Sequence, residues 1–284
     1  TAFGYQALSA TTGATGNSAF GYQAGAGLVS GTANTLVGYQ AGERATSSPD
    51  NTFIGYNAGV GGTGTHIYSA TGGNTGIGAN ALDAITTGFR NTAIGSSAHG
   101  SLTTGDSNIA IGYNAATGLT TGTGNLALGT LSAQFGTTGS DNAALGYTAL
   151  QKSVTGSQNV AIGSNASLNN VSATSTVAIG YRAGYGTAGY YNQGGTYIGY
   201  QAGRLVDAGS DYNTLVGYQA GYNVSTGQYN TMLGYFSGTG GVTTGSNNIL
   251  IGKDVRAGLT VTSSDQLNIG NLIFGTGLGS AATL

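Results

Sequence analysis

A large hydrophobic residue followed by glycine recurs along the whole chain at a nearly fixed spacing. Each of sixteen glycines directly follows Phe, Ile, Val or Leu, and ten of the fifteen intervals between them are 17 residues long. The other intervals are one of 23 residues, one of 19 and three of 18. So short a period allows one small structural unit per repeat, and such units are stable only when they stack. The pattern predicts a solenoid. These motif glycines, from which repeat positions are counted below, are Gly4, Gly21, Gly38, Gly55, Gly78, Gly95, Gly112, Gly129, Gly146, Gly163, Gly180, Gly199, Gly217, Gly234, Gly252 and Gly270.

Each repeat is typical of short extended segments. In the repeat NTAIGSSAHGSLTTGDS (91–107), β-prone residues occupy positions −3 to −1, Asn occupies −4 and Ala occupies +3. Gly, Thr and β-branched residues disfavour helix, and a second glycine at −7 suggests a coil of two short strands with two corners. We therefore expect an all-β fold, a parallel β-solenoid or β-roll of about 16 coils with a 17-residue repeat.

The Asn at position −4, present in twelve of fifteen repeats, predicts a ladder of side chains. Stacked coils lie about 4.8 Å apart, and side-chain amides at that spacing can hydrogen-bond to one another. The motif glycine suits a corner that needs positive φ or close backbone approach. In the most regular repeats the expected ladder and corner residues are Asn91, Asn108, Asn125, Asn142, Asn159, Gly95, Gly112, Gly129, Gly146 and Gly163.

Apolar residues on both faces of the short strand predict self-association. Positions −3 and −1 share one face of a strand, and −2 takes the other. Position −1 is always large and apolar, so we expect it to fill the coil interior. Position −2 is also apolar: it is Ala in eight repeats and, for example, Leu36, Phe53 or Met232 in others. One coil has only one interior, so the second apolar face must be buried by another surface. The simplest such surface is the same face of an identical chain.

Composition narrows the class of protein. The chain has 55 Gly, 1 Pro, 18 Tyr, no Cys, 6 % charged residues and a net charge of −2. Glycine without a three-residue period excludes collagen, and regularly spaced apolar residues argue against disorder. The absence of a basic patch argues against nucleic acid as a partner. No apolar run approaches the ~18 residues of a membrane helix, so we expect no membrane insertion. The chain begins within a repeat, which suggests a piece of a longer protein.

The repeats N-[TSI]-x-[IVL]-G-[YS]-x-A, clearest in NTAIG (91–95), NIAIG (108–112) and NVAIG (159–163), resemble the head repeats of trimeric autotransporter adhesins (YadA-like). The resemblance implies a left-handed parallel β-roll and an intertwined or side-by-side homotrimer over residues 1–270, although the usual family coil is shorter than this repeat. Residues 264–275 are similar to the segment upstream of the endosialidase-type chaperone domain of phage tail fibres. That similarity implies that 271–284 is a tail or a junction to a removed domain.

These features predict a non-enzymatic structural protein: the shaft or head of a fibre or adhesin, extracellular, at a cell surface or on a virion. It would need no cofactor, and its main partner would be itself. Because no polar cap is visible at either end, open strand edges and an end-to-end filament are also expected. The rival hypothesis is a ligand-binding module that recognises a host-surface glycan or protein, or ice.

Candidate binding residues follow from tyrosines and from departures from the period. Tyr occupies position +1 in ten repeats, which predicts an aromatic stripe; corner packing is the alternative interpretation. The insertions near 59–73 and 184–195 should form surface loops. A row of Thr at −8 suggests either ice binding or turn formation, and His66 and His99 lie too far apart to indicate a metal site. The candidate ligand-binding residues are His66, Tyr68, Tyr113, Tyr147, Tyr181, Tyr190 and Tyr191.

Overall fold

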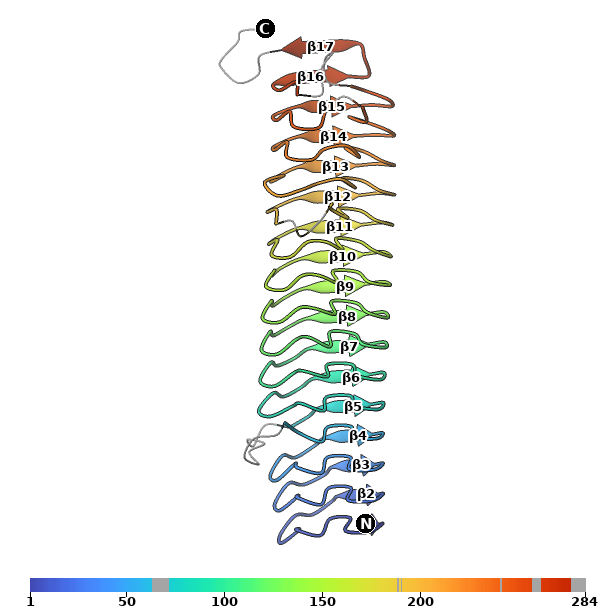
Figure 1. The fold of residues 1–284 in the computed structure, drawn as a ribbon, viewed down its shortest axis with the longest axis vertical. Helices are drawn as coiled ribbons and strands as arrows, with labels where there is room; N and C mark the ends of the chain where they lie inside the picture. The colour runs from blue at the N-terminus through green and yellow to red at the C-terminus, as the bar shows by residue number, and fades with distance from the viewer. Residues whose placement is uncertain (63–71, 188, 190, 241, 257–261, 277–284) are drawn as a thin grey trace. The chain divides into compact units, whose positions relative to one another are not determined.

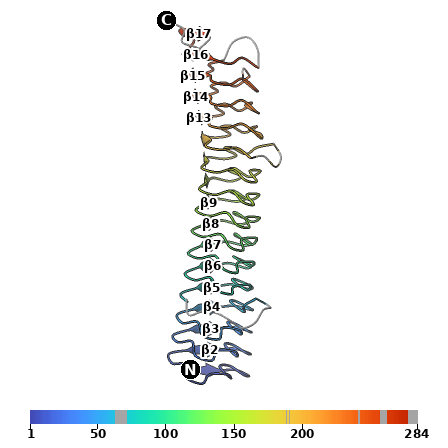
Figure 2. The same cartoon turned by 90° about the vertical axis from the view of Figure 1, so that its left-hand side faces the viewer.

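The computed structural model describes residues 1–62, 72–187, 189, 191–240, 242–256 and 262–276. Every regular element among these residues is a β-strand and none is a helix, which confirms the predicted all-β class. The chain divides into two compact units, unit 1 (Thr1–Asn142) and unit 2 (Ala143–Leu284). In each unit, short strands stack above one another along one side of the coils (Figure 1, Figure 2).

In unit 1, each repeat forms one strand over positions −3 to −1, except that β1 is one residue shorter. Neighbouring strands pair in parallel, and the register follows the repeat, so that Ile94 lies opposite Ile111 and Ile111 lies opposite Leu128. The 17-residue period therefore defines one coil, and the predicted solenoid is confirmed. The strands are β1 (Ala2–Phe3), β2 (Ser18–Phe20), β3 (Thr35–Val37), β4 (Thr52–Ile54), β5 (Thr75–Ile77), β6 (Thr92–Ile94), β7 (Ile109–Ile111) and β8 (Leu126–Leu128).

Unit 2 repeats this plan and adds one antiparallel strand. Strands β9 to β16 pair in parallel, each with the next, and β17 pairs antiparallel with β16. The strands are β9 (Ala143–Leu145), β10 (Val160–Ile162), β11 (Val177–Ile179), β12 (Thr196–Ile198), β13 (Thr214–Val216), β14 (Thr231–Leu233), β15 (Ile249–Ile251), β16 (Gln266–Ile269) and β17 (Ile273–Thr276).

The remainder of each coil is built from turns, so the expectation of two strands per coil is wrong. Positions −5, +2 and +4 adopt left-handed backbone, as in Ser107 (φ 57°), Asn114 (φ 52°) and Ala116 (φ 47°). Backbone hydrogen bonds still join one coil to the next outside the strands, for example from the Thr103 N–H to the Thr120 carbonyl (2.9 Å). The turns are therefore held by the stack, which offsets their intrinsic strain.

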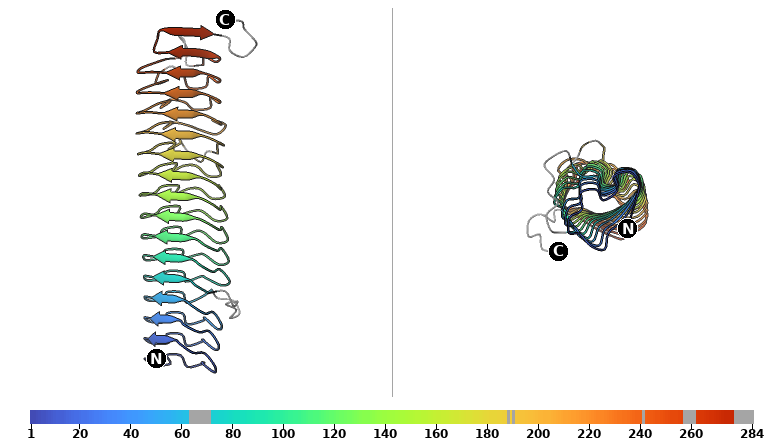
Figure 3. Two further views of the ribbon diagram at one scale, coloured as in Figure 1. Left: turned by 180° about the vertical axis from the view of Figure 1, so that it is seen from behind. Right: turned by 90° about the horizontal axis from the view of Figure 1, so that it is seen from below.

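The strand face that points inward is also the opposite of the one expected. From β2 to β15, position −2 is buried: Ala110 and Leu215, for example, have no exposed surface. Position −1 points outward instead, and Ile94 and Leu145 keep 36 % and 43 % of their surface exposed. Seen end-on, the ribbon of the coils closes around one interior (Figure 3). The buried side chains at −2 share this interior with those at other buried positions, such as Leu82 at +4.

The physical reason is that positions −2 and +4 share a fixed interior volume. Phe53 at −2 occurs with Gly59 at +4, where an added Cβ would lie 2.5 Å from the phenyl ring. Conversely, Gly76 at −2 occurs with a fully buried Leu82 at +4. No coil from β2 to β14 has a large side chain at both positions, because a second one would overpack the interior. Position −1 shows no such compensation because it lies outside the core.

The asparagine ladder runs through the interior of both units. Asn108 Nδ2 donates to Asn91 Oδ1 (3.2 Å) and to the Gly122 carbonyl (2.8 Å), and Asn108 Oδ1 accepts from the backbone and side-chain N–H groups of Asn125. The same bonds link Asn17 through Asn142 in unit 1 and Asn213 through Asn248 in unit 2. In unit 2, Asn159 donates to the Ala173 carbonyl (2.7 Å). Buried polar groups are thus satisfied along the stack.

Gly195 replaces this Asn in one coil of unit 2, and Tyr197 takes over part of its role. Tyr197 at −2 is fully buried, and its hydroxyl occupies the space that a side chain at Gly195 would need. The hydroxyl donates to the Ser210 carbonyl (3.4 Å), the position equivalent to the usual Asn acceptor, and accepts from Asn192 Nδ2 (2.7 Å). The insertion that carries Asn192 therefore supports the core.

Strand β17 pairs with the edge of β16 and is the last described strand of unit 2. Ile269 lies opposite Ile273 in this antiparallel pair. In β16 the inward position −2 is Asn268, which is 5 % exposed and donates to the carbonyl of Arg256 (3.0 Å) and to Asn271 Oδ1 (3.1 Å). A polar residue thus closes the apolar interior below β17.

Candidate functional site

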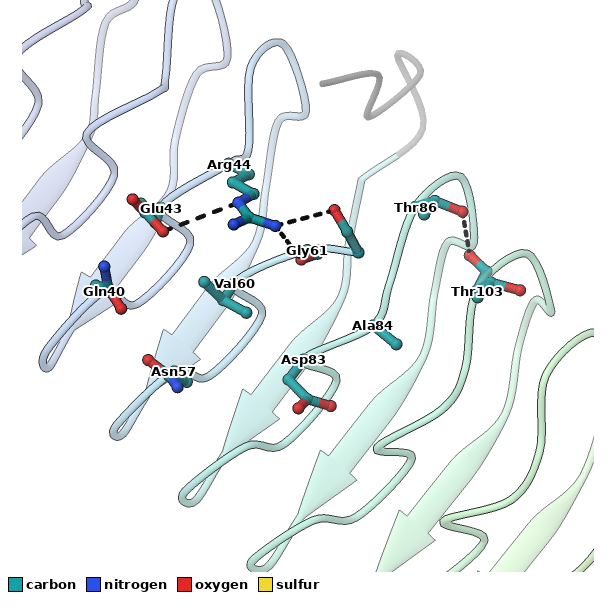
Figure 4. A pocket seen from close by; sticks show the side chains of 11 residues that line it. Gln40, Glu43, Arg44, Asn57, Val60, Gly61, Asp83, Ala84, Thr86 and Thr103 are labelled. Atoms are coloured by element: carbon teal, nitrogen blue, oxygen red, sulfur yellow. Dashed lines mark hydrogen bonds and ion pairs between the residues drawn. The ribbon is translucent and has the colours of Figure 1, made fainter. Parts of the chain in front are cut away.

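Unit 1 has a groove of about 680 Å³ on the side of its coils formed by positions +2 and +5, which we call the +2/+5 face. Position +2 supplies Gln40 and Asn57, and position +5 supplies Glu43, Val60 and Asp83 (Figure 4). These positions project from the turns that follow β3, β4 and β5. The stacking of the coils brings these five residues together, although Gln40 and Asp83 are 43 residues apart in the sequence.

One wall of the groove is held by Arg44. Its Nη1 donates to the carbonyls of Gly62 (3.3 Å) and Gly61 (3.5 Å), and its Nε lies 4.0 Å from Glu43 Oε2 (Figure 4). This is the one ion pair among the described residues. The guanidinium therefore fixes the chain leading toward the insertion.

The groove floor offers oxygen acceptors. Burial raises the pKa of Asp83, while the backbone N–H groups of Asp83 and Ala84 partly lower it. Asn57 Oδ1 is buried and accepts no hydrogen bond from the described residues. The carboxylates of Asp83 and Glu43 line the groove and suit a hydroxyl-bearing ligand, whereas the buried Asn57 Oδ1 is out of its reach. The sequence analysis missed this site, although Glu43 and Asp83 share position +5 two coils apart, a signal that aligning charged residues by repeat would have found.

The predicted tyrosine stripe consists of two stacks of rings. Ring centroids lie 5.1–5.3 Å apart in unit 1 and 5.0–5.4 Å apart in unit 2. Because stacked rings cover each other's faces, a sugar ring can stack only where an adjoining coil lacks Tyr. Elsewhere only ring edges and hydroxyls face solvent. The stacked residues are Tyr5, Tyr22, Tyr39 and Tyr56 in unit 1, and Tyr181, Tyr200, Tyr218 and Tyr235 in unit 2.

Two predicted candidates, Tyr113 and Tyr147, stand apart from these stacks. Tyr113 is 56 % exposed, and the equivalent positions of the adjoining coils are Ser96 and Thr130. Tyr147 is similarly exposed, and Ser164 follows it at position +1 of the next coil. These rings keep faces on which a ligand could stack, but the structure does not bring them together with the other candidates.

The structure describes only part of the two insertions, near 59–73 and 184–195. His66, Tyr68 and Tyr190 lie outside the described residues. Tyr191 is 61 % exposed, whereas its neighbour Asn192 is buried against Tyr197. The described part of the second insertion therefore contributes one exposed ring and one core contact.

The threonine row lies at the bends of the coils. The −8 residues, such as Thr104, are exposed beside the buried −7 glycine. The preceding Thr at −9 is half-buried, and Thr103 Oγ1 donates to the carbonyl of Thr120 (3.0 Å). This geometry favours the turn-forming interpretation.

Unit 2 carries an arginine–tyrosine cluster on its +2/+5 face, which the sequence analysis also missed. Tyr185, Arg204 and Tyr222 occupy position +5 of three successive coils. The Arg204 guanidinium carbon lies 5.9 Å from the Tyr185 ring centroid and 5.3 Å from that of Tyr222, to whose hydroxyl Nη1 donates (2.6 Å). Arg182, at +2, lies over Tyr185 (5.3 Å) and over the predicted Tyr181 (5.1 Å).

His99 is a core residue. It occupies position +4 and has no exposed surface. Burial lowers the pKa of its imidazole to about 3, an effect that the backbone of Ala116 only partly offsets. The ring is therefore neutral at physiological pH. No group of three or more His, Cys, Asp or Glu that could hold a metal occurs in the described part of the chain.

Acid is expected to destabilise unit 1 through His99. Because the folded pKa is about 3 and the unfolded value about 6.5, the unfolded state binds the proton first as the pH falls. The contribution of neutral His99 to the unfolding free energy is therefore complete above about pH 6.5 and is lost progressively down to about pH 3. At pH 5 the unfolding free energy should be lower by about 2 kcal/mol. Urea unfolding from pH 7 to pH 5 measures the slope. Leu occupies the equivalent position +4 in other repeats, for example as Leu82 and Leu150. The variant His99→Leu should therefore remove the pH dependence that arises from this imidazole. If the slope of stability against pH stayed the same in the variant, His99 would not be its cause.

Comparisons with protein-family models, curated proteins and solved structures find no match. Among the described residues there is no helix that could cross a membrane. The resemblance to trimeric adhesin heads therefore stays a prediction.

Proposed function

We propose that this chain is a structural, non-enzymatic segment of a fibre or adhesin, a shaft or head at a cell surface or on a virion, assembled from three copies side by side. The observation that supports this function is the outward face of the strands. Position −1 carries a large hydrophobic side chain in every repeat, and its most exposed members within the stacks keep 36–45 % of their surface exposed. They are Phe20, Ile54, Ile94, Leu145, Ile162 and Leu233.

This face has no charge. Positions −3 and −1 hold no Asp, Glu, Lys or Arg in any repeat, and −3 is Thr, Ser or aliphatic. Exposed, flat, uncharged strands are adhesive, and natural sheets commonly protect them with charges or a cover. The stripe of −1 side chains in each unit therefore requires a covering surface.

A second copy of the chain suits this stripe better than an unrelated partner. The apolar side chains repeat once per coil, and only a surface with the same spacing can match them over many coils. An identical chain provides that spacing at every position. Cyclic association of three copies closes the interface without leaving an apolar face in solvent, as the resemblance implies.

Charged substitutions in the stripe are expected to abolish assembly. The double variant Ile94→Lys, Ile111→Lys places two like charges in the contact, and desolvating them would oppose association. Light scattering should show wild-type protein at three times the 27.8 kDa chain mass and the variant at one chain mass. The control Thr87→Lys, Thr104→Lys adds the same charges at exposed bends of the same coils and should assemble as wild type. A monomeric wild-type protein at micromolar concentration would overturn the proposal.

A ligand-binding module is the second candidate function. The observation that favours it is the arginine–tyrosine cluster of unit 2, which lies on a different side of the coil from the strand face. Binding there and self-association through the strands are compatible, so the two functions are tested separately.

A further inference from the structure

We propose that Arg182 and Arg204, with Tyr185 and Tyr222, form a binding site for the carboxylate groups of an acidic polysaccharide. The site goes beyond the structural function proposed above and does not depend on it. It lies on the +2/+5 face of the coils that follow β11, β12 and β13, and every residue of it belongs to unit 2.

The two guanidinium groups lack an anion. No carboxylate lies within 4.0 Å of either one among the described residues, where the single ion pair is that of Arg44 with Glu43. Both arginines are half-buried, and their Nε atoms are buried without a hydrogen-bond partner in the described part of unit 2. Six of the seven basic residues lack an ion pair within the described part of the chain, so this cluster is distinguished by two guanidinium groups on adjoining coils that share the ring of Tyr185. Because the buried Nε atoms are out of reach of a ligand, an anion would bind through the other N–H groups of these half-buried guanidinium groups.

The nearby acids are engaged elsewhere. Asp207 Oδ2 accepts from the Thr187 hydroxyl (2.7 Å), and Asp211 Oδ1 accepts from the Gln193 backbone N–H (2.8 Å). Both carboxylates therefore bond to residues of the preceding coil. The cluster remains locally positive although the chain as a whole carries a net charge of −2.

The rings hold the guanidinium groups in place for a planar anion. Arg204 lies between Tyr185 and Tyr222 and is fixed further by its 2.6 Å bond to the Tyr222 hydroxyl. Arg182 contacts Tyr185 from the neighbouring position +2. Stacking on aromatic faces leaves guanidinium N–H groups directed along the ring edges, and these N–H groups match the two oxygens of a carboxylate.

A sugar acid suits the site better than a nucleic acid or an acidic peptide. A phosphate polymer is bound by an extended basic field, and this chain has none. Tyrosines beside polar groups are typical of surfaces that recognise sugars, because a pyranose offers C–H groups to the ring and hydroxyls to its neighbours. A repeating uronic acid could also place successive carboxylates near successive coils.

Calorimetric titration with a galacturonate hexamer tests the proposal, with its fully methyl-esterified form as the uncharged counterpart. We expect binding of the acid form only, weakened by added salt. Arg182→Gln and Arg204→Gln should each reduce affinity about tenfold or more. Arg182→Lys keeps the charge without the planar fork and should give an intermediate affinity.

Arg90→Gln is the matched control, since Arg90 also lies over a ring, that of Phe89 (5.3 Å), but belongs to unit 1. It should bind as wild type. Light scattering and circular dichroism establish that each variant keeps the wild-type assembly and fold, so a failure of the fibre hypothesis is recognised separately. Equal binding of the esterified hexamer, undiminished binding by both Gln variants, no binding by wild type, or equal binding of a single-stranded oligonucleotide would each overturn the proposal.

Discussion

Replacing Gly122 by alanine is expected to destabilise unit 1 by about 3 kcal/mol or more. Gly122 occupies position −7, where a side chain would point at the backbone of the next coil. An added Cβ would overlap the carbonyl oxygen of Gly139 in the next coil and lie 2.8 Å from Leu119 Cδ1. Backbone and asparagine hydrogen bonds hold the coils at the strand spacing and oppose their local separation. Urea unfolding at fixed protein concentration measures the loss.

The matched control for this variant is Gly100→Ala. Gly100 also lies in a turn of unit 1, but the nearest atoms to an added Cβ are the Ser97 oxygen at 3.4 Å and Thr117 Cγ2 at 3.5 Å. These are ordinary contacts, so a change within about 0.5 kcal/mol is expected, or slight stabilisation through the unfolded state. If both variants lost equal stability, close packing between coils would not be the reason for glycine at −7.

The motif glycine acts by a different mechanism from the −7 glycine. Gly112 has φ +137°, and an added Cβ would lie 2.6 Å from the backbone of Gly129. Both the backbone conformation and the space exclude a side chain. The motif position is glycine in every repeat, whereas position −7 is also occupied by Ser48, Ala173 and Ser210. The two positions differ in φ and in their contacts with the next coil.

The period and the buried Asn made the main features of the fold predictable from sequence. Asn108 recurs one period after Asn91, and only a stack of equal coils places such residues at bonding distance. The period also predicted the parallel register. These features depend on spacing alone, which a single sequence displays fully.

The direction of the strand faces could not be predicted in the same way. Positions −1 and −2 are both apolar, so alternation gives no answer. The deciding quantity is the shared volume of −2 and +4, as in Phe53 with Gly59 and Gly76 with Leu82. These pairs are visible in the sequence, but nothing in the period says which two positions face the same interior. The left-handed turns at +2 and +4 bring them together.

The candidate sites were missed for a related reason. The sequence analysis aligned tyrosines by repeat position, which located the stripe, but it did not align the charged residues. Tyr185, Arg204 and Tyr222 all occupy position +5 of successive repeats. Aligning the repeats in the sequence is enough to show that these three residues stack above one another. The approach of Arg182 from position +2 depends on its left-handed backbone (φ 52°) and needed the structure.

The second large effect is expected at the asparagine ladder. Asn108→Ala should lower the unfolding free energy by about 3 kcal/mol. The change leaves the Gly122 carbonyl and the Asn125 backbone N–H without the partners they have now, at 2.8 and 2.9 Å. Each buried polar group left unpaired costs about 1–3 kcal/mol, and a site with no exposed surface admits no replacement water without rearrangement. Thr104→Ala, at an exposed bend four residues before Asn108, should change stability by less than about 0.5 kcal/mol.

A double variant tests whether the ladder is a connected network. Asn91→Ala and Asn108→Ala each remove the bond between Asn108 Nδ2 and Asn91 Oδ1, so their combined loss should be smaller than the sum of the single losses by about 1 kcal/mol. Asn34→Ala with Asn108→Ala shares no bond, because Asn34 bonds to Asn17 and Asn51 instead, and those losses should add. Additive losses in both pairs would mean that each Asn serves only its own coil and that register is held by the backbone alone.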